Sequence, residues 1–233
     1  MKALILAAGF GSRLAPLTDN LPKSLVSVNG TPILFNQIDN LVKNNVREIT
    51  IVSGYLSKVL QTNVLKKYPF VNIIENTIYD KTNNMYSAYL AKDLFCDELL
   101  MMNADVFFDS SIITELLSCE NGNAIATDKG KYNIESMKIE FDGNSITSIS
   151  KNISKDKAYG VSIDVYKFSP KGANAFYNIC RNYIETQNEK KLWSEVALND
   201  TLKEISFIPC DITGKWYEID NYEDLKKAEE LFA

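Results

Sequence analysis

The chain has 233 residues, 45% of them hydrophobic, and a formal net charge of -5 at pH 7. This length and composition predict one large core, and the acidic balance argues against a nucleic-acid partner, because a surface that follows a phosphate backbone needs a basic stripe. The sequence contains no histidine, which excludes serine-histidine and cysteine-histidine nucleophiles and leaves carboxylates, lysine, arginine, backbone amides or a hard metal ion for any chemistry.

The first half alternates β-rich and helical runs, a pattern typical of βαβ units on a mostly parallel sheet. Thr31 and Pro32 are expected to form the cap and first turn of a helix whose apolar residues begin at Ile33. The sheet is predicted to come mostly from this half. In chain order we expect a strand over 3–8, that helix, a strand over 48–53, a helix over 57–68, a strand over 71–75, a helix over 86–95 and a strand over 99–102.

The second half begins with a change of pattern. Residues 137–141 and 145–150 flank the turn sequence Asp142-Gly143-Asn144 and predict an antiparallel hairpin. A strand over 159–168, helices over 170–186 and 193–202, strands over 205–209 and 216–218, and a final helix over 222–232 follow. We therefore predict an α/β fold: a Rossmann-like mixed, mostly parallel sheet flanked by helices, with a small antiparallel β element in the second half.

Four cysteines are widely spaced without a CxxC motif, which favours reduced thiols over a zinc site or a disulfide framework. The apolar run 3–8 is too short for a signal-peptide core, and no later stretch approaches the roughly 20 apolar residues that span a bilayer. We expect a cytoplasmic protein without membrane insertion.

The strongest functional signal is the run Leu6-Ala7-Ala8-Gly9-Phe10-Gly11-Ser12-Arg13, with Pro22-Lys23 ten residues later. After a buried strand, two glycines let backbone amides approach an anion closely, and Arg13 and Lys23 supply positive charge beside them. A glycine pair alone is often only a turn. The run is neither a Walker A motif nor a full GxGxxG motif, since Leu14 occupies the position of the third glycine. Together these residues predict a phosphate cradle.

This motif, LAAGFGSRLAPLTDNLPKSL, resembles the signature of the sugar-phosphate nucleotidyltransferase superfamily. The resemblance implies the nucleotidyltransferase fold in a single domain, 1–233, with an NTP-binding part at about 1–127 and an acceptor-binding part at about 128–233. It also implies that Arg13 and Lys23 are catalytic, with Lys23 neutralising charge at the reacting α-phosphate. The implied nucleotide-binding residues of the motif are Leu6, Ala7, Ala8, Gly9, Gly11, Ser12, Arg13 and Lys23.

Two aspartates are candidate metal ligands. Asp105 follows an apolar strand, at the edge where ligands of open α/β sheets gather, and a carboxylate there suits a hard divalent ion. Asp220 precedes the last helix. Each alone is equally well explained as a cap or turn residue. The resemblance implies that the two hold Mg2+ and that Asp105 also contacts the nucleotide.

Within the superfamily, Asn83-Asn84-Met85-Tyr86-Ser87 resembles a segment of the bacterial CTP:phosphocholine cytidylyltransferase branch. That similarity implies CTP as the nucleotide, with Tyr86 and Ser87 against its base and ribose. An apolar helix stripe would explain the tyrosine equally well, but not the paired asparagines.

The acceptor is expected to be a small phosphorylated amino compound such as phosphocholine, phosphoethanolamine or an aminoalkylphosphonate. Aromatic faces beside carboxylates attract an ammonium group, although core packing explains either tryptophan as well. A tryptophan of the phosphocholine branch is replaced here by the segment 135–138, which is more similar to relatives with other amino-phosphate or phosphonate acceptors. The candidate acceptor residues are Trp193, Glu195, Trp216, Glu218 and Lys151.

Three alternatives stay open. A sugar-1-phosphate nucleotidylyltransferase would make an NDP-sugar, and a non-catalytic relative would bind nucleotide as a regulatory module. A dinucleotide-binding oxidoreductase is disfavoured by the missing third glycine. We also consider a homodimer and a role in activating a head group for a surface glycan or lipid.

Overall fold

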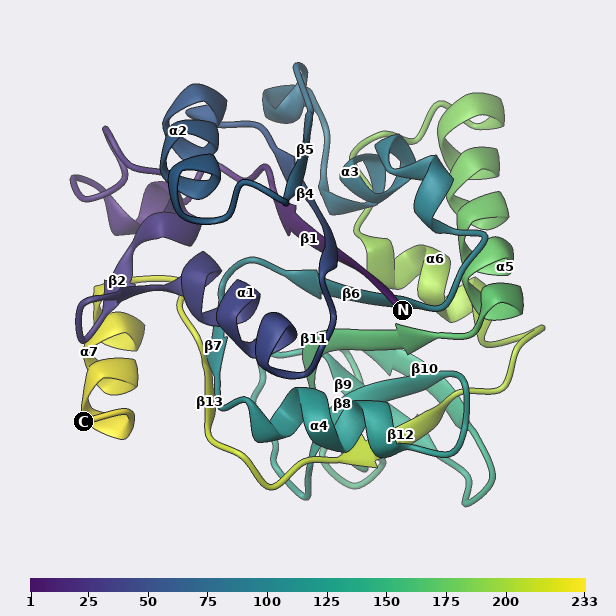
Figure 1. Ribbon diagram of the computed structural model, residues 1–233. Helices are drawn as coiled ribbons and strands as arrows, with labels where there is room; N and C mark the ends of the chain where they lie inside the picture. Colours follow the sequence, from purple (N-terminus) through teal and green to yellow (C-terminus); the bar gives the residue numbers. More distant parts are fainter.

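A computed structural model describes residues 1–233, and its centre is one nine-stranded mixed β-sheet (Figure 1). The strands lie in the order β10-β9-β11-β6-β1-β4-β5, while β8 pairs with both β11 and β12. β6, β1, β4 and β5 run parallel, and β11 joins β6 antiparallel. These strands are β1 (Lys2–Ala7), β4 (Glu48–Ser53), β5 (Asn72–Glu75), β6 (Leu99–Asn103), β8 (Ala124–Lys129), β9 (Lys138–Phe141), β10 (Ile146–Ser150), β11 (Gly160–Phe168) and β12 (Ile208–Asp211).

Two further sheets have two strands each: β2 (Ser27–Val28) pairs with β3 (Thr31–Pro32), and β7 (Val106–Phe108) pairs with β13 (Trp216–Glu218). None of the helices is long and apolar enough to cross a membrane. The α-helices are α1 (Ile33–Lys43), α2 (Ser57–Lys67), α3 (Asn84–Leu90), α4 (Ser111–Ser118), α5 (Pro170–Arg181), α6 (Ser194–Thr201) and α7 (Tyr222–Leu231).

Helices cover both faces of the sheet, as the packing of the β1 side chains shows. Ala3, Ile5 and Ala7 pack in one hydrophobic cluster with α1, α2 and α4, whereas Leu4 and Leu6 pack in a second cluster with α3, α5 and α6. Side chains alternate between the faces of a strand, so an uninterrupted apolar strand indicates a sheet buried on both sides. Figure 1 shows α3, α5 and α6 gathered together, with α7 far from them beside the C-terminus.

Three segments meet at the carboxyl edge of the parallel strands. β1 and β6 pair with Leu6 opposite Asn103, so the chain segments that follow these two strands leave the sheet side by side. β13 pairs with β7, and the backbone N-H of Ile219 donates to the carbonyl of Asp105 at 2.9 Å. This edge is where open α/β sheets bind ligands.

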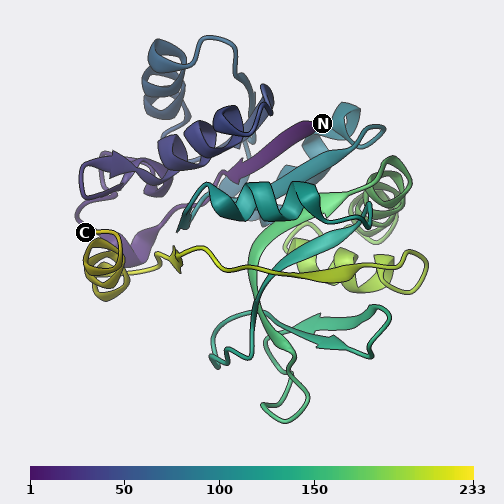
Figure 2. The same ribbon diagram turned by 60° about the horizontal axis from the view of Figure 1, so that its bottom comes forward.

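The predicted fold class is confirmed, as is the antiparallel hairpin, formed by β9 and β10. Figure 2 shows this hairpin projecting from the rest of the molecule. The prediction that the first half supplies most of the sheet is wrong, because β8 to β12 all lie beyond residue 123. Helix α4 and strand β8 were not anticipated, although residues 111–118 carry apolar side chains at helical spacing.

Several boundaries also differ from the expectation. Pro32 has an extended backbone and pairs in β3, so α1 begins one residue later. The helix expected over 86–95 begins at Asn84, where the Asn83 side chain accepts the first N-H, and its α-helical part ends at Leu90. The helix expected over 170–186 changes to a π-helix at Asn182.

Candidate active site

The loop after β1 forms the first wall of the site. Gly11 has φ +66, a left-handed conformation that side chains rarely adopt, and a Cβ there would lie 2.6 Å from the Cβ of Lys23. The Thr18 hydroxyl donates to the Gly11 carbonyl at 2.9 Å and fixes the turn. At Gly9, by contrast, a Cβ would meet no protein atom within 4 Å. Gly11 therefore lets the loop fold onto Lys23, while Gly9 faces open space.

Lys23 lies at the centre of an ion cluster. Its Nζ is 2.9 Å from Asp105 Oδ2 and 2.8 Å from Asp220 Oδ1, and Arg13 Nη2 is 2.8 Å from the same Asp220 oxygen. Burial opposes the charge of Lys23, but the two carboxylates outweigh it and raise its pKa to about 12. In the same way, Lys23 and Arg13 outweigh burial at Asp220 and lower the pKa of its carboxyl.

A third carboxylate, Glu218, completes an acidic cluster. Ligand oxygens of Asp105, Glu218 and Asp220 lie within 4.8 Å of one another. Burial, together with the charges of Asp105, Asp164 and Asp220, raises the pKa of Glu218 to about 9. Asp105 Oδ1 is buried without a hydrogen-bond partner. Three crowded carboxylates with an unpartnered oxygen fit a hard divalent cation.

Local sequence holds Asp220 in place. Asn221 caps α7, its side chain accepts from the N-H groups of Glu223 and Asp224, and the Asp224 carboxylate accepts from the N-H of Asn221 in return. That carboxylate also accepts from the N-H of Asp220 at 3.1 Å. The capping box fixes the start of the helix and, with it, the aspartate immediately before the cap.

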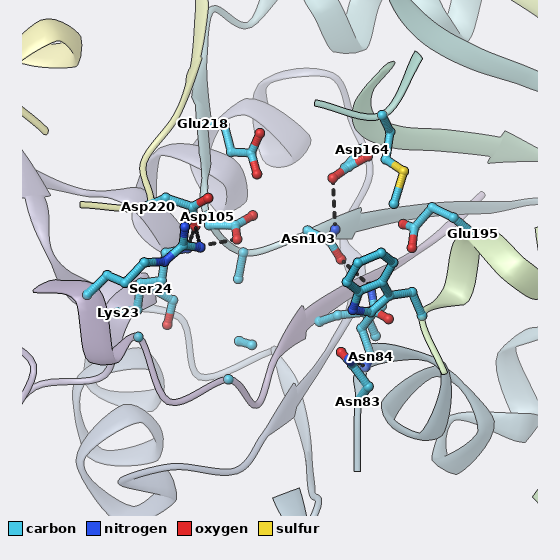
Figure 3. Close-up of a pocket in the computed structure, with 18 of the residues that line it drawn as sticks. Lys23, Ser24, Asn83, Asn84, Asn103, Asp105, Asp164, Glu195, Glu218 and Asp220 are labelled. Atoms are coloured by element: carbon cyan, nitrogen blue, oxygen red, sulfur yellow. Dashed lines mark hydrogen bonds and ion pairs between the residues drawn. The ribbon is translucent and has the colours of Figure 1, made fainter. Parts of the chain in front are cut away.

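These groups line a cavity of about 380 Å³ at the sheet edge. Figure 3 shows Lys23, Asp105, Asp220 and Glu218 gathered on one side of it, and Asp164, Asn103, Glu195, Asn84 and Asn83 on the other. A neighbouring cavity of about 210 Å³ shares Gly9 and Asp105 with the first and extends to Ala8 and Ser87. The site is thus an elongated cleft with charged groups at both ends.

The other side of the cleft carries two acidic residues, Asp164 and Glu195, that share a hydrogen-bond partner. The Tyr166 hydroxyl lies 2.9 Å from Asp164 Oδ1 and 3.1 Å from Glu195 Oε1, and Ser194 Oγ donates to the same Glu195 oxygen. Asn103 Nδ2 donates to Asp164 Oδ2 at 3.1 Å. Burial and the nearby charge of Glu195 raise the pKa of Asp164 to about 7, and burial raises that of Glu195 as well.

Most of the predicted residues meet in this cleft. Trp193, 45% exposed, lines it, and Lys151 Nζ lies 5.2 Å from the centre of the Trp193 ring. The other predicted residues that line the cleft or its neighbouring cavity are Leu6, Ala7, Ala8, Gly9, Gly11, Ser12, Arg13, Lys23, Ser87, Asp105, Glu195, Glu218 and Asp220.

Two predicted residues do not line these cavities. Trp216 is buried beside a third cavity, which shares Arg13, Glu218 and Asp220 with the main one. The Trp216 Nε1 donates to Asp128 at 2.8 Å, and Lys131 covers its ring. Tyr86 lines neither part of the cleft and packs against Tyr89, with ring centres 5.8 Å apart. Its position is that of the apolar helix stripe that the sequence also allowed.

The sequence interpretation missed Asp164 and Asn103, and it assigned Glu218 to the acceptor rather than to the acidic cluster. Asp164 left a signal: an acidic residue inside the otherwise apolar run of β11. Asn103 ends β6 just before Asp105 and could have been included by the same sheet-edge argument. Glu218 is recognisable only once β13 is paired with β7.

A glycine loop, two cations and an acidic cluster at the carboxyl edge of parallel strands define a class: α/β proteins that bind phosphate-rich nucleotides with a divalent cation. Comparison with known proteins narrows this class. The family model described as nucleotidyl transferase matches residues 2–127. The chain therefore belongs to the nucleotidyl transferase family and is an enzyme of that class.

Relatives cover nearly the whole chain. CTP:phosphoglutamine cytidylyltransferase of Campylobacter jejuni is 30% identical over 97% of this chain and 98% of its own length. 2-Aminoethylphosphonate cytidylyltransferase of Lancefieldella rimae is 32% identical over 84% of this chain and 79% of its own. The structure of CTP:phosphocholine cytidylyltransferase from Streptococcus pneumoniae matches with a TM-score of 0.84 and 27% identity, over 100% of this chain and 99% of that one.

Proposed function

We propose that the protein transfers CMP from CTP, with Mg2+, to a small phosphorylated amino compound, giving a CDP-linked product and pyrophosphate. The observation that carries this proposal is the two-ended cleft. A phosphate cradle with Lys23 and Arg13 stands at one end, and the acid pair Asp164 and Glu195 stands at the other. The similarity to relatives whose names specify cytidylyltransferases supports CTP as the nucleotide.

The proposed division of the cleft follows from the position of the loop. The triphosphate lies along Gly9, Gly11 and Ser12, which line the cavity together with Arg13 and can offer backbone N-H groups to an anion. The base and ribose occupy the neighbouring cavity beside Ser87. The acceptor occupies the end lined by Asp164, Trp193 and Glu195, all from the second part of the chain.

The reaction needs no protein nucleophile. A phosphate oxygen of the acceptor attacks the α-phosphorus of CTP, an oxygen-phosphorus bond forms, and the bond to the leaving pyrophosphate breaks on the opposite side. Lys23 and Arg13 offset negative charge that develops on the nonbridging oxygens, and the cradle holds the reacting groups in line. Catalysis then consists of positioning and electrostatic stabilisation.

The residues suited to hold Mg2+ are Asp105, Asp220 and Glu218. Their crowding and the unpartnered Asp105 Oδ1 fit such an ion, which would supply positive charge to the phosphates when bound. Lys23 pairs with two of these three carboxylates and balances part of their negative charge.

The test is pyrophosphate release with Mg2+ across CTP, UTP, ATP, GTP and dTTP, each against phosphoethanolamine, 2-aminoethylphosphonate, phosphocholine, glycerol phosphate and glucose 1-phosphate. We expect turnover with CTP and an amino acceptor, abolished by EDTA. Turnover with UTP or dTTP and glucose 1-phosphate would instead identify an NDP-sugar-forming enzyme. Nucleotide binding without pyrophosphate release for any pair would support the regulatory alternative.

A further inference from the structure

The acceptor end of the cleft holds two carboxyl groups that form no ion pair within the protein. Asp164 and Glu195 share the Tyr166 hydroxyl as a hydrogen-bond donor, yet neither forms an ion pair with a lysine or arginine. Glu195 is only 5% exposed. A buried carboxylate without a partner is costly, and a cationic group arriving with a ligand would supply the partner that this pair lacks.

The backbone at Asp164 supports a role in binding. Asp164 has φ +58 within β11, where the pairing with β8 shifts register between Ser162 and Tyr166. The Ser162 hydroxyl accepts from the N-H of Asp164 at 3.1 Å and stabilises this local conformation. A left-handed non-glycine residue inside a strand is strained, and such residues cluster at functional sites. Here the irregularity turns an acidic side chain into the cleft.

The aromatic content of the same cleft decides which kind of cation fits. Trp193 is the only aromatic residue among the 21 that line the main cavity, and Lys151 already lies against its ring. The other tryptophan, Trp216, does not line this cavity and is buried under Lys131. Quaternary ammonium groups are recognised by cages of several aromatic faces, because they have no N-H to donate. This cleft offers hydrogen-bond acceptors instead of a cage.

We propose that the acceptor carries a primary ammonium group whose N-H bonds are accepted by Asp164 and Glu195, and that the cleft discriminates against a trimethylammonium group. This inference rests on the proposed function and narrows its substrate class. Each methyl group on the nitrogen removes one donor and adds volume beside the carboxylates. A trimethylated acceptor leaves both carboxylates without a hydrogen bond from the ligand, and sites built to hydrogen-bond a polar group reject analogues that lack it.

The experiment compares kcat/KM for phosphoethanolamine, its N-methyl and N,N-dimethyl derivatives, and phosphocholine, with CTP and Mg2+. We expect kcat/KM to fall with each methyl group and to be about 100-fold lower for phosphocholine than for phosphoethanolamine. Phosphocholine turnover within about threefold of phosphoethanolamine would overturn the inference and leave the proposed function standing. CTP turnover with none of the four amines and none with 2-aminoethylphosphonate would overturn both.

Variants identify the groups responsible. Asp164→Asn and Glu195→Gln keep shape but remove charge. Each should lower kcat/KM for phosphoethanolamine about 10- to 100-fold while leaving that for ethyl phosphate, which has no ammonium group, nearly unchanged. Glu48→Gln, an exposed position at the amino end of β4 and opposite the sheet edge that holds the site, is the matched control. Equal losses for phosphoethanolamine and ethyl phosphate would refute ammonium binding by these residues. The methylation series on the wild-type enzyme gives its answer even if a variant fails to fold.

Discussion

Replacing Lys23 with methionine tests the centre of the site most directly. The substitution keeps a long apolar stem but removes the ammonium that contacts Asp105 at 2.9 Å and Asp220 at 2.8 Å. Two carboxylates then face each other, with Glu218 nearby, without their shared cation. The variant should lose stability and catalytic rate together, because the same charge serves the folded state and the reaction.

The stability loss can be worked from the geometry and the pKa. Raising the pKa of Lys23 from 10.5 to about 12 corresponds to about 2 kcal/mol of favourable interaction of the charged form. Breaking a fully buried pair costs about 3–5 kcal/mol, and less here because the aspartate side chains are 26% and 25% exposed. We expect a loss of about 2–4 kcal/mol, or roughly 4–16 °C in Tm for a chain of this size.

The pH dependence of this difference has a definite sign. The pKa of Asp220 is lowered from 3.8, so its contribution to stability is present above that pH and is lost as the pH falls through the folded-state pKa. The pKa of Lys23 is raised, so its contribution is present below 10.5 and is lost as the pH rises through about 12. The Tm difference between wild type and Lys23→Met should be constant from about pH 6 to pH 9 and shrink in acid.

The assay measures Tm with EDTA and with Mg2+, and kcat for pyrophosphate release, with Lys66→Met as the matched control on the exposed face of α2. We expect kcat to fall roughly 100-fold or more. Mg2+ should raise the Tm of the Lys23 variant more than that of wild type, because the ion no longer competes with the lysine for the same oxygens. A Tm within 1 °C of wild type, roughly the resolution of such a comparison, and an unchanged kcat would refute the role given to Lys23.

Three further predictions concern the cradle, the acidic cluster and the tryptophans. Gly11→Ala should lower the free energy of unfolding, measured by chemical denaturation, by about 1–3 kcal/mol, because Gly11 has a positive φ and an added Cβ would collide with Lys23. Gly9→Ala should keep stability but raise the KM for CTP, and an unchanged KM would contradict the cradle. Asp220→Asn should abolish the rise in Tm on Mg2+ addition, and a wild-type rise would exclude it as a ligand. Trp216→Phe should lower Tm with little change in kcat/KM, whereas Trp193→Ala should raise the KM for the acceptor at constant Tm. The reverse pattern would show that Trp216 binds the acceptor and that Trp193 supports the fold.

Much of the fold follows from local patterns in the sequence. The apolar run of β1 and its glycine loop, the capped start of α7 and the Asp-Gly-Asn hairpin each carry a short-range signal. The order of strands does not. β11 enters the sheet antiparallel between β6 and β8, a non-local choice made by packing of both faces that no window of sequence encodes.

The site residues also fall into those that local sequence predicts and those that only the folded structure reveals. The phosphate cradle was predictable because its residues are contiguous and their spacing carries the chemistry. Asp164 was not singled out, because its role depends on an irregular backbone within a strand. The orientation of Trp216 could not be predicted for a related reason. An aromatic residue beside acidic neighbours in sequence carries no information about which way its ring turns, and here its Nε1 donates to Asp128.

The pairing of β13 with β7 ties distant parts of the chain together. Every strand of the nine-stranded sheet is complete by Asp211, yet Glu218 and Asp220 follow later in the chain. Two of the three clustered carboxylates are therefore carried by a segment outside that sheet, held to it through β7 and the N-H of Ile219. Lys23 and Asp220 are 197 positions apart and lie 2.8 Å from each other, so a substitution that loosens β13 can disturb the ion cluster without altering the central sheet.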